Sequence, residues 1–419
     1  MINEVNKILI DVGSSTVKVY KYSDRLNLIL QRSLFFKEGF DPEGGISQKN
    51  KKELFELLEA VKEQNKNTPI KIYATGIFRK LASETKVNFI DEIFLRTGLY
   101  FNIIDQDLES FYLEMALVGK FSLNEPLLLI NIGGGSTELV VMYGKESIEK
   151  VNLDFGVSKI LSDFPGTNNE VSNVKLEKIV EHVKNYLPPL KNRPRIAFYT
   201  GGELTYMKLA KYPLHKNNLF EDEDHPFIIS FKDFREKNKE IFEKITLKNL
   251  ENLMPENPKW MHGARACSAI AQAICEKYNI EKIIPSDSNI INGVIRQEFR
   301  YVTLSGSFRK HLDYILKTKE ELEKTGTIVL SPRFTKPKNP GEEFVIFQGE
   351  EDLSPLELER YHLNSIKNSD ALIVCDPRGY VGASALLEIG FAHSLGKRII
   401  FTEKPEEFIL NNLPFEVGI

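Results

Sequence analysis

The chain has 419 residues, a formal net charge of −4, and 42% hydrophobic against 27% charged residues. This length exceeds what one hydrophobic core serves and predicts roughly two to four domains. The balance is that of a soluble folded protein, and no apolar run reaches the roughly 20 residues that cross a bilayer. The negative charge argues against a general nucleic-acid binder, which needs a basic surface. No membrane partner is expected.

The polar start of the chain shows no signal-peptide pattern, which predicts a cytoplasmic protein. Its three cysteines, Cys267, Cys275 and Cys375, form no CxxC pair. A disulfide framework or a zinc site is therefore not expected.

Residues 7–22 predict a hairpin, with strands at 7–11 and 17–22 around the turn 12–16. Residues 127–142 predict a second one, in which three consecutive glycines separate two apolar runs. Glycines leave backbone N–H groups free to face an anion, so such a turn suits a phosphate. A glycine hairpin without a ligand is the alternative for either turn alone. The candidate phosphate contacts are Gly13, Ser14, Ser15, Thr16, Gly133, Gly134, Gly135, Ser136 and Thr137.

The two hairpins align with one another, because residues 11–14 match residues 131–134 in pattern. They lie about 120 residues apart, which is the span of a small domain. We therefore predict a duplicated domain in which two phosphate loops face one another across a cleft.

This pair of loops resembles the superfamily of actin, the sugar kinases and the heat-shock ATPases. Within it, residues 5–300 are most similar to the exopolyphosphatase and guanosine pentaphosphate phosphatase (Ppx/GppA) family. Further stretches support the resemblance, namely 74–79, 103–110, 154–158, 199–203, and a helix, strand and closing helix over 263–293. The resemblance implies a two-lobed actin-like ATPase (ribonuclease H-like) α/β fold, with lobe I at 1–124 and lobe II at 125–299.

The resemblance also implies roles for individual residues. Arg79 and Lys18 would bind phosphate, Glu109 and Glu138 would be catalytic, and Asp11 with Glu138 would hold Mg²⁺. The alternatives are a surface salt bridge for Arg79 and a solvated helix face for Glu109.

Two departures from the family stand out. Asn131 occupies a position where the family has aspartate, and the family's glutamate pair is reduced to Leu108 and Glu109. Asparagine keeps an acceptor oxygen but loses the negative charge, so Mg²⁺ affinity should fall. Either catalysis tolerates these losses, or the lobes bind a phosphorylated ligand without cleaving it.

Residues 227–261 are rich in lysine and glutamate with spaced apolar residues. This pattern predicts exposed amphipathic helices, and no chemistry is expected there.

Strands and helices alternate again after residue 300, which predicts a small doubly wound parallel-sheet domain at 300–419. The expected strands are 301–305, 327–330, 371–375 and 398–401, and the expected helices are 310–324, one starting at Ser354 and Pro355, and 383–395. Ligands are expected beyond the carboxyl ends of the strands.

Those ends resemble the nucleoside 2-deoxyribosyltransferase family. The resemblance implies that Glu388 is a carboxylate nucleophile, and that a nucleotide contacts Gly306, Ser307, Phe308, Arg309, Asp376 and Arg378. The family's aspartate six residues before the glutamate is Gly382 here, so Asp370 and Asp376 are its possible substitutes. A carboxylate favoured by the helix dipole is the alternative for Glu388.

Together these features predict an enzyme that releases terminal phosphate from polyphosphate or a guanosine polyphosphate, fused to a nucleotide N-glycosidase or deoxyribosyltransferase-like domain. The alternative is a non-catalytic sensor of a phosphorylated nucleotide that controls the C-terminal domain. A homodimer is an open alternative for its assembly.

Overall fold

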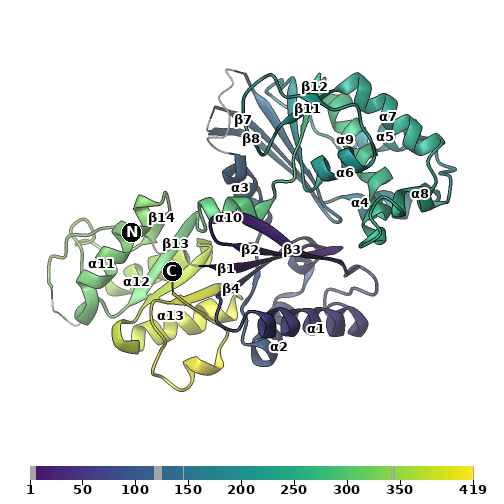
Figure 1. Cartoon of the computed structure of the whole chain (residues 1–419). Helices are drawn as coiled ribbons and strands as arrows, with labels where there is room; N and C mark the ends of the chain where they lie inside the picture. The colour runs from purple at the N-terminus through teal and green to yellow at the C-terminus, as the bar shows by residue number, and fades with distance from the viewer. Residues whose placement is uncertain (1–5, 118–124, 145, 341, 343–344, 419) are drawn as a thin grey trace.

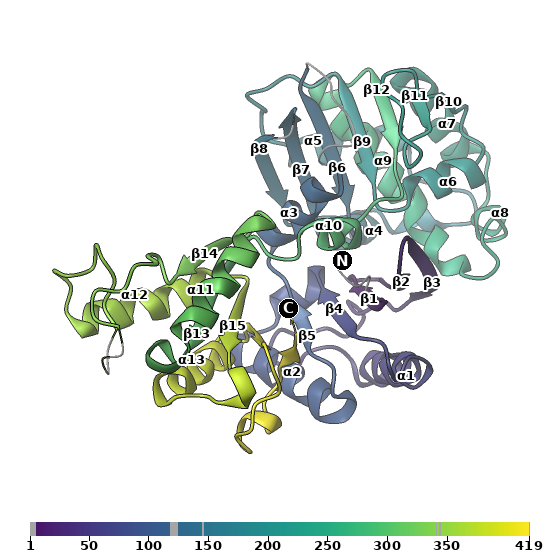
Figure 2. The same cartoon turned by 60° about the vertical axis from the view of Figure 1, so that its left-hand side comes forward.

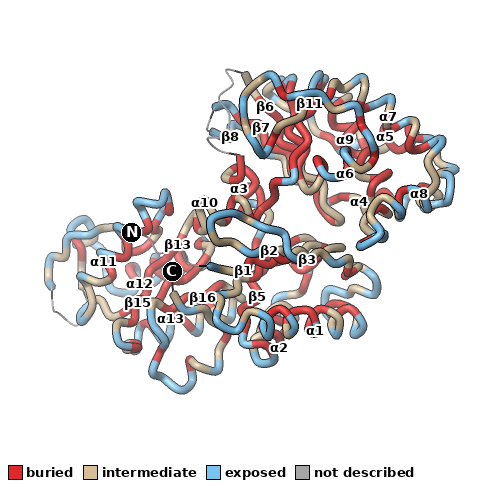
Figure 3. The backbone as a smooth tube through the Cα atoms, in the orientation of Figure 1, coloured by how far each residue is buried: buried red, intermediate tan, exposed pale blue. Residues whose placement is uncertain are grey.

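The structure is a computed structural model that describes residues 6–117, 125–144, 146–340, 342 and 345–418. Three β-sheets organise these residues, and Figures 1 and 2 show them as three bodies, with the body of the first sheet between the other two. In each body the strands form the buried centre (Figure 3). The predicted lobe boundary at residue 124 and the first five residues, part of the start used to predict the location, lie outside the described residues.

The first sheet has the strand order β3-β2-β1-β4-β5. Its strands are β1 (Lys7–Val12), β2 (Thr16–Tyr22), β3 (Leu26–Ser33), β4 (Ile70–Ala74) and β5 (Phe101–Ile103). Successive side chains of a strand point to opposite faces, so Ile8 and Ile10 pack with α1 (Gln48–Gln64) and α2 (Ser83–Thr97), whereas Leu9 packs with α3 (Gln106–Leu117).

The second sheet repeats this arrangement. Its order is β10-β11-β12-β9-β6-β7-β8, from strands β6 (Leu127–Ile132), β7 (Thr137–Tyr143), β8 (Glu146–Leu153), β9 (Ile196–Thr200), β10 (His215–Lys216), β11 (Phe227–Ser230) and β12 (Lys282–Pro285). The run β8-β7-β6-β9-β12 has the same sequence of antiparallel and parallel pairings as β3-β2-β1-β4-β5. The predicted duplication is therefore confirmed.

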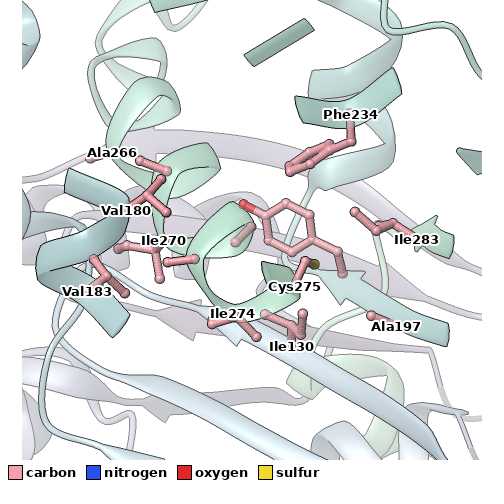
Figure 4. Close-up of a cluster of buried hydrophobic side chains, with 14 of the residues drawn as sticks. Ile130, Val180, Val183, Ala197, Phe234, Ala266, Ile270, Ile274, Cys275 and Ile283 are labelled. Atoms are coloured by element: carbon pink, nitrogen blue, oxygen red, sulfur yellow. The ribbon is translucent and has the colours of Figure 1, made fainter. Parts of the chain in front are cut away.

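The helices of this half are α4 (Val157–Asp163), α5 (Leu176–Lys184), α6 (Glu203–Leu209), α7 (Phe231–Glu243), α8 (Leu247–Glu251), α9 (Ala264–Tyr278) and α10 (Ile290–Arg296). Helix α9 carries small and apolar side chains and packs against both the sheet and α5. Figure 4 shows Ile270 beside Val183 of α5 and Ile274 beside Ile130 of β6. Helix α10 returns to the first half and packs against α3.

The prediction of exposed helices over 227–261 is wrong in part. Residues 227–230 form strand β11 instead, which pairs with β12, and Ile229 is fully buried. Phe234 of α7 packs in the same core as Ile270 of α9, so α7 is amphipathic but not free-standing. Within α7 the charged residues outnumber the apolar ones, and the few apolar ones decide the packing.

The third sheet is entirely parallel, with the order β14-β13-β15-β16-β17. Its elements are β13 (Tyr301–Gly306), α11 (Phe308–Lys324), β14 (Ile328–Ser331), α12 (Pro355–Asn368), β15 (Ala371–Cys375), α13 (Ala383–Ser394), β16 (Arg398–Phe401) and β17 (Glu416–Val417). The capping box predicted at Ser354 is present, with Glu357 as its partner. Helix α11 starts at Phe308, two residues earlier than predicted, because the N–H groups of Lys310 and His311 already donate to the carbonyl of Ser307.

A buried charge network joins the third sheet to the first. The carboxylate of Glu298 accepts from Lys71 (2.7 Å) and Arg398 (2.6 Å), and Arg398 also donates to Glu416. Burial alone would raise the pKa of Glu298, but Arg398 and Lys71 hold it well below its usual range.

None of the helices in the described part of the chain combines the length and apolar character that a bilayer crossing requires.

Candidate active site

The two predicted phosphate turns have the same backbone. In the first, the N–H of Gly13 donates to the carbonyl of Thr16, and in the second the N–H of Gly133 donates to Ser136, both at 2.9 Å. Across the first hairpin Asp11 pairs with Lys18. Across the second, Asn131 pairs with Glu138. Lys18 and Glu138 are therefore equivalent positions of the repeat.

The two turns face one another, as the repeat predicted. A Cβ placed on Gly134 would lie 2.7 Å from the hydroxyl oxygen of Ser15, and one on Gly135 would lie 3.1 Å from that of Ser14. A side chain at either position would crowd the serine hydroxyls of the first turn. The glycines of the second turn thus bring both turns to one place.

The stretch 154–158 supports the second turn from behind. The N–H groups of Val157 and Ser158 donate to the carbonyls of Gly133 (3.0 Å) and Gly134 (2.9 Å). A Cβ on Gly156 would lie 2.2 Å from the Gly133 carbonyl oxygen, so glycine is required for this contact. The turn's carbonyls are used by the protein, which leaves its consecutive N–H groups suited to an anion.

A cleft of ≈ 260 Å³ lies between the halves and is lined by residues of both turns. Of the predicted phosphate, catalytic and metal residues, those that line it are Asp11, Gly13, Ser14, Ser15, Thr16, Lys18, Glu109, Gly133 and Gly134. The others, Arg79, Gly135, Ser136, Thr137 and Glu138, are not among its lining residues.

Glu109 is a buried acid that lines this cleft. Arg79 forms an ion pair with it and also donates to the hydroxyl of Ser136 at 3.2 Å. The side chains of Arg79 and Glu109 are only 17% and 8% exposed, so neither the surface salt bridge nor the solvated helix face describes them. Burial raises the pKa of Glu109 to about 8, the neighbouring Glu138 adds to the effect, and Arg79 opposes it.

Two lysines bring positive charge to the turns. Lys18 donates to the carbonyl of Gly201 at 3.2 Å, which ties the first hairpin to the second half. Lys37 donates to the carbonyl of Gly134 at 2.9 Å, and burial, with Lys80 nearby, lowers its pKa to about 8. Lys37 was missed by the sequence analysis because it belongs to no motif. Burial also raises the pKa of Asp11 to about 6, against the pull of Lys18.

Part of the cleft lining is largely apolar. Leu161, Tyr206, Trp260 and Cys267 line it, and Glu203 stands among them. Burial raises the pKa of Glu203 to about 8, and the Cys267 thiol lies 3.6 Å from its carboxyl group. The sequence analysis expected no chemistry at 227–261, yet residues 259–261 line the cleft. The single tryptophan of the chain was the available signal.

Comparison with known proteins agrees with this geometry. The model of the Ppx/GppA phosphatase family matches residues 28–301. The chain belongs to the Ppx/GppA phosphatase family.

Solved structures share the fold of this Ppx/GppA chain. The Aquifex aeolicus family member is 18% identical with a TM-score of 0.52, over 70% of this chain and 96% of its own. An exopolyphosphatase from Cytophaga hutchinsonii is 14% identical with a TM-score of 0.56, over 69% of this chain and 96% of its own. No curated protein matches the chain. The predicted two-lobed fold is confirmed, and the family match ends where the third sheet begins.

A Ppx/GppA-type metal site was expected at Asp11 and Glu138. Among the described residues, no three acidic, histidine or cysteine side chains are grouped as a metal would need. Asp11 lines the cleft and suits a hard cation. Glu138 is fully buried, and its two oxygens already accept from Asn131 (2.7 Å) and Gln106 (3.0 Å). Asp11 thus fits Mg²⁺, whereas Glu138 fits it only after losing an amide partner.

Beside the third sheet, Glu388 of α13 lies 3.2 Å from Nε2 of His362 in α12. Nδ1 of His362 lies 2.7 Å from the hydroxyl of Ser331. Burial opposes protonation of His362, but Glu388 outweighs it and raises the His362 pKa. The hydroxyl groups of Thr303 and Ser305 are buried on the neighbouring strand, where no hydrogen-bond partner is found within the described structure.

The other predicted nucleotide contacts follow strands β13 and β15, at the carboxyl end of the third sheet. Gly306 ends β13, Ser307 and Phe308 start α11, and Arg309 and Arg378 are exposed. Asp376 follows β15 and is buried, and burial raises its pKa to about 6. Asp370 instead accepts from the N–H groups of Arg300 and Tyr301 at the amino end of the sheet. Of the two possible substitutes, only Asp376 is at the end of the sheet where Glu388 lies.

Proposed function

We propose that the cleft hydrolyses the terminal phosphate of polyphosphate or of a guanosine polyphosphate. The observation that carries the proposal is Glu109, a buried carboxyl group placed between two facing phosphate turns. Its raised pKa, about 8, is near neutral pH, where a general base transfers protons efficiently. Membership of a phosphatase family supports the same chemistry.

In this mechanism the phosphate chain lies against the backbone N–H groups of the two turns, with Lys18 as a point charge. Glu109 accepts a proton from a water whose oxygen bonds to the terminal phosphorus. The bond from that phosphorus to the bridging oxygen breaks, and the remaining phosphate chain leaves with the electron pair. Arg79 holds Glu109 in place and anchors it to Ser136.

Mg²⁺ is proposed to join this site at Asp11, together with the substrate. When bound, it would neutralise charge on the phosphate oxygens. The orientation of the water and the transfer of its proton are assigned to Glu109 alone.

A phosphate-release assay on polyphosphate and on guanosine pentaphosphate tests the proposal. Glu109→Gln should lower the rate by roughly 10²- to 10⁴-fold while binding remains. The control is Asp107→Asn, the same acid-to-amide change at an exposed position of α3. Tight binding of either substrate by the unaltered protein, without any release, would instead favour the sensor.

A second candidate function is cleavage of a nucleotide's N-glycosidic bond at the third sheet. It is favoured by the buried pair of Glu388 and His362 beside two buried hydroxyl groups that lack partners in the described structure. The Glu388 carboxylate would attack the anomeric carbon, the base would leave with the bonding electrons and take up a proton, and water would later release the sugar. Arg309 and Arg378 would contact a 5′-phosphate.

Release of free base from nucleotides tests this second candidate. The release should disappear in Glu388→Gln and persist in Glu320→Gln, which changes an exposed glutamate of α11. If the unaltered protein releases no base from any nucleotide, the glycosidic function is wrong.

A further inference from the structure

The second hairpin differs from the first in how its paired side chains interact. Asn131 donates its amide N–H to Oε2 of Glu138 at 2.7 Å, and Gln106 of α3 donates to Oε1 at 3.0 Å. Glu138 has no solvent-exposed surface. Two side-chain amides therefore hold the carboxylate, one on each oxygen. We call these three residues the amide clamp.

The amide clamp opposes a divalent cation in two ways. A cation at Glu138 would have to displace at least one amide, and each N–H···carboxylate bond is worth roughly 1.5–3 kcal/mol as a charge-assisted hydrogen bond. The amide N–H groups also present positive hydrogen atoms toward the place that a cation would occupy. The carbonyl oxygen of Asn131 is directed elsewhere, about 3.5 Å from the Cβ that Gly201 would carry.

The charged groups around the amide clamp also disfavour a divalent cation at Glu138. Glu109, the next carboxyl group, forms an ion pair with Arg79, whereas Lys18 faces Asp11 across the first hairpin and donates to the carbonyl of Gly201. Glu109 and Glu138 thus each have nitrogen partners from the protein. In the part of the phosphate end that the structure describes, this leaves no pair of unpartnered carboxylates for a cation to bridge.

We propose that Asn131 keeps Glu138 bound to protein amides, so that this end of the cleft takes a phosphate chain without a preformed divalent-cation site. A cation then enters only on the phosphate chain. A single carboxylate at position 131 would place two acids side by side and create the missing site. The inference rests on the proposed phosphate-binding role of the cleft, but its test requires no turnover.

The test is calorimetric titration of the full chain with Mg²⁺ and with Mn²⁺, in the absence of phosphate. Asn131→Asp should bind either cation saturably and at least tenfold more tightly than the unaltered protein, and its Tm should rise with cation concentration. The control is Asn27→Asp, which adds the same charge at an exposed position of β3 and should behave like the unaltered protein.

A second variant and a second measurement allow the inference to be tested even if the first variant does not fold. If Asn131→Asp does not fold, Gln106→Glu places a carboxylate at the other oxygen of Glu138 and should also bind the cation. In addition, the unaltered protein should bind tripolyphosphate in the presence of a chelator.

Three results would overturn the inference. They are saturable cation binding by the unaltered protein equal to that of the variants, no cation binding by a folded variant, or loss of tripolyphosphate binding in the chelator. Absence of phosphate release would contradict the proposed hydrolysis alone, because none of these measurements depends on it.

Discussion

The two hairpins that form the phosphate end share a backbone but not a side-chain pair. The first carries Asp11 opposite Lys18, and the second carries Asn131 opposite Glu138. Lys18 reaches out of its hairpin to the carbonyl of Gly201 in the other half, whereas Asn131 bonds to the residue facing it. Phosphate binding depends on the backbone geometry of the turns, so both hairpins have the same backbone. The paired side chains determine the charge of each hairpin, and in this respect the two hairpins differ.

Glu109 lies between the two hairpins and responds to both. Burial and the neighbouring Glu138 raise its pKa, and Asp11 adds a smaller effect in the same direction. The first hairpin therefore bridges the halves and provides positive charge, and the second hairpin adds to the proton affinity that burial gives the proposed base. Each prediction below alters one side of this comparison.

The largest effect is expected when the second turn loses its backbone support. Gly156→Ala places a Cβ that would lie 2.2 Å from the Gly133 carbonyl, so the turn or the stretch 154–158 must move. Overpacking of this kind lowers the free energy of unfolding by about 1–3 kcal/mol. Phosphate binding should weaken as well, by roughly tenfold or more, which is about 1.4 kcal/mol of binding free energy, because the N–H groups of the turn are displaced. Denaturant unfolding and tripolyphosphate binding measure the two consequences.

The control for this change is Gly390→Ala in α13, where an added Cβ meets nothing within 4 Å. It should leave phosphate binding unchanged and stabilise the helix by up to about 1 kcal/mol. Equal binding by Gly156→Ala and the unaltered protein would show that the second turn does not hold phosphate.

A smaller effect is expected from the first hairpin. Lys18→Gln removes its positive charge and should weaken tripolyphosphate binding by about tenfold at low salt, with less loss at high salt because the charge is then screened. Lys21→Gln makes the same change on the exposed part of β2 and should leave affinity unchanged. If both variants bind alike, Lys18 serves only to join the halves through Gly201.

The smallest effect is a shift in pH dependence. A general base acts when it is deprotonated, so the phosphate-release rate should rise with pH through about 8 and level off above it. Glu138→Gln removes the like charge beside Glu109, which should lower the Glu109 pKa and move the midpoint to lower pH. A pH series with both proteins measures the shift.

Glu114→Gln is the matched control for this shift, because Glu114 lies on the same helix but pairs with Lys150. Its midpoint should stay where it is in the unaltered protein. A midpoint that does not move in Glu138→Gln would place the control of Glu109 elsewhere.

Local patterns predicted much of the fold and part of the site. Alternating apolar residues around glycine turns identified both hairpins, and a capping box located the start of α12. These signals act over a few residues, so they survive without the rest of the chain. The strand at 227–230 was missed because its partner, β12, follows more than fifty residues later.

The candidate site depended more on distant contacts. Lys37 and Trp260 belong to no motif, and Gln106 lies in the stretch 103–110 but was given no role. They reach the cleft or Glu138 only because the segment after β3, the segment before α9 and helix α3 meet there. Glu138 follows the three glycines by only three residues, yet it is not among the residues that line the cleft and is held by amides. The spacing of residues in a sequence does not show which hydrogen-bond partners a side chain will have.

The sequence by itself determined that two similar glycine turns exist, because the absence of side chains at consecutive positions is a local property. It also determined that position 131 is an amide where an acid was expected. Only the tertiary structure decided what that amide does, since Asn131, Glu138 and Gln106 come from three different elements. Charge and hydrogen-bond partners are properties of the assembled cleft, and the opposing pairs of the two hairpins appear only when both halves face one another.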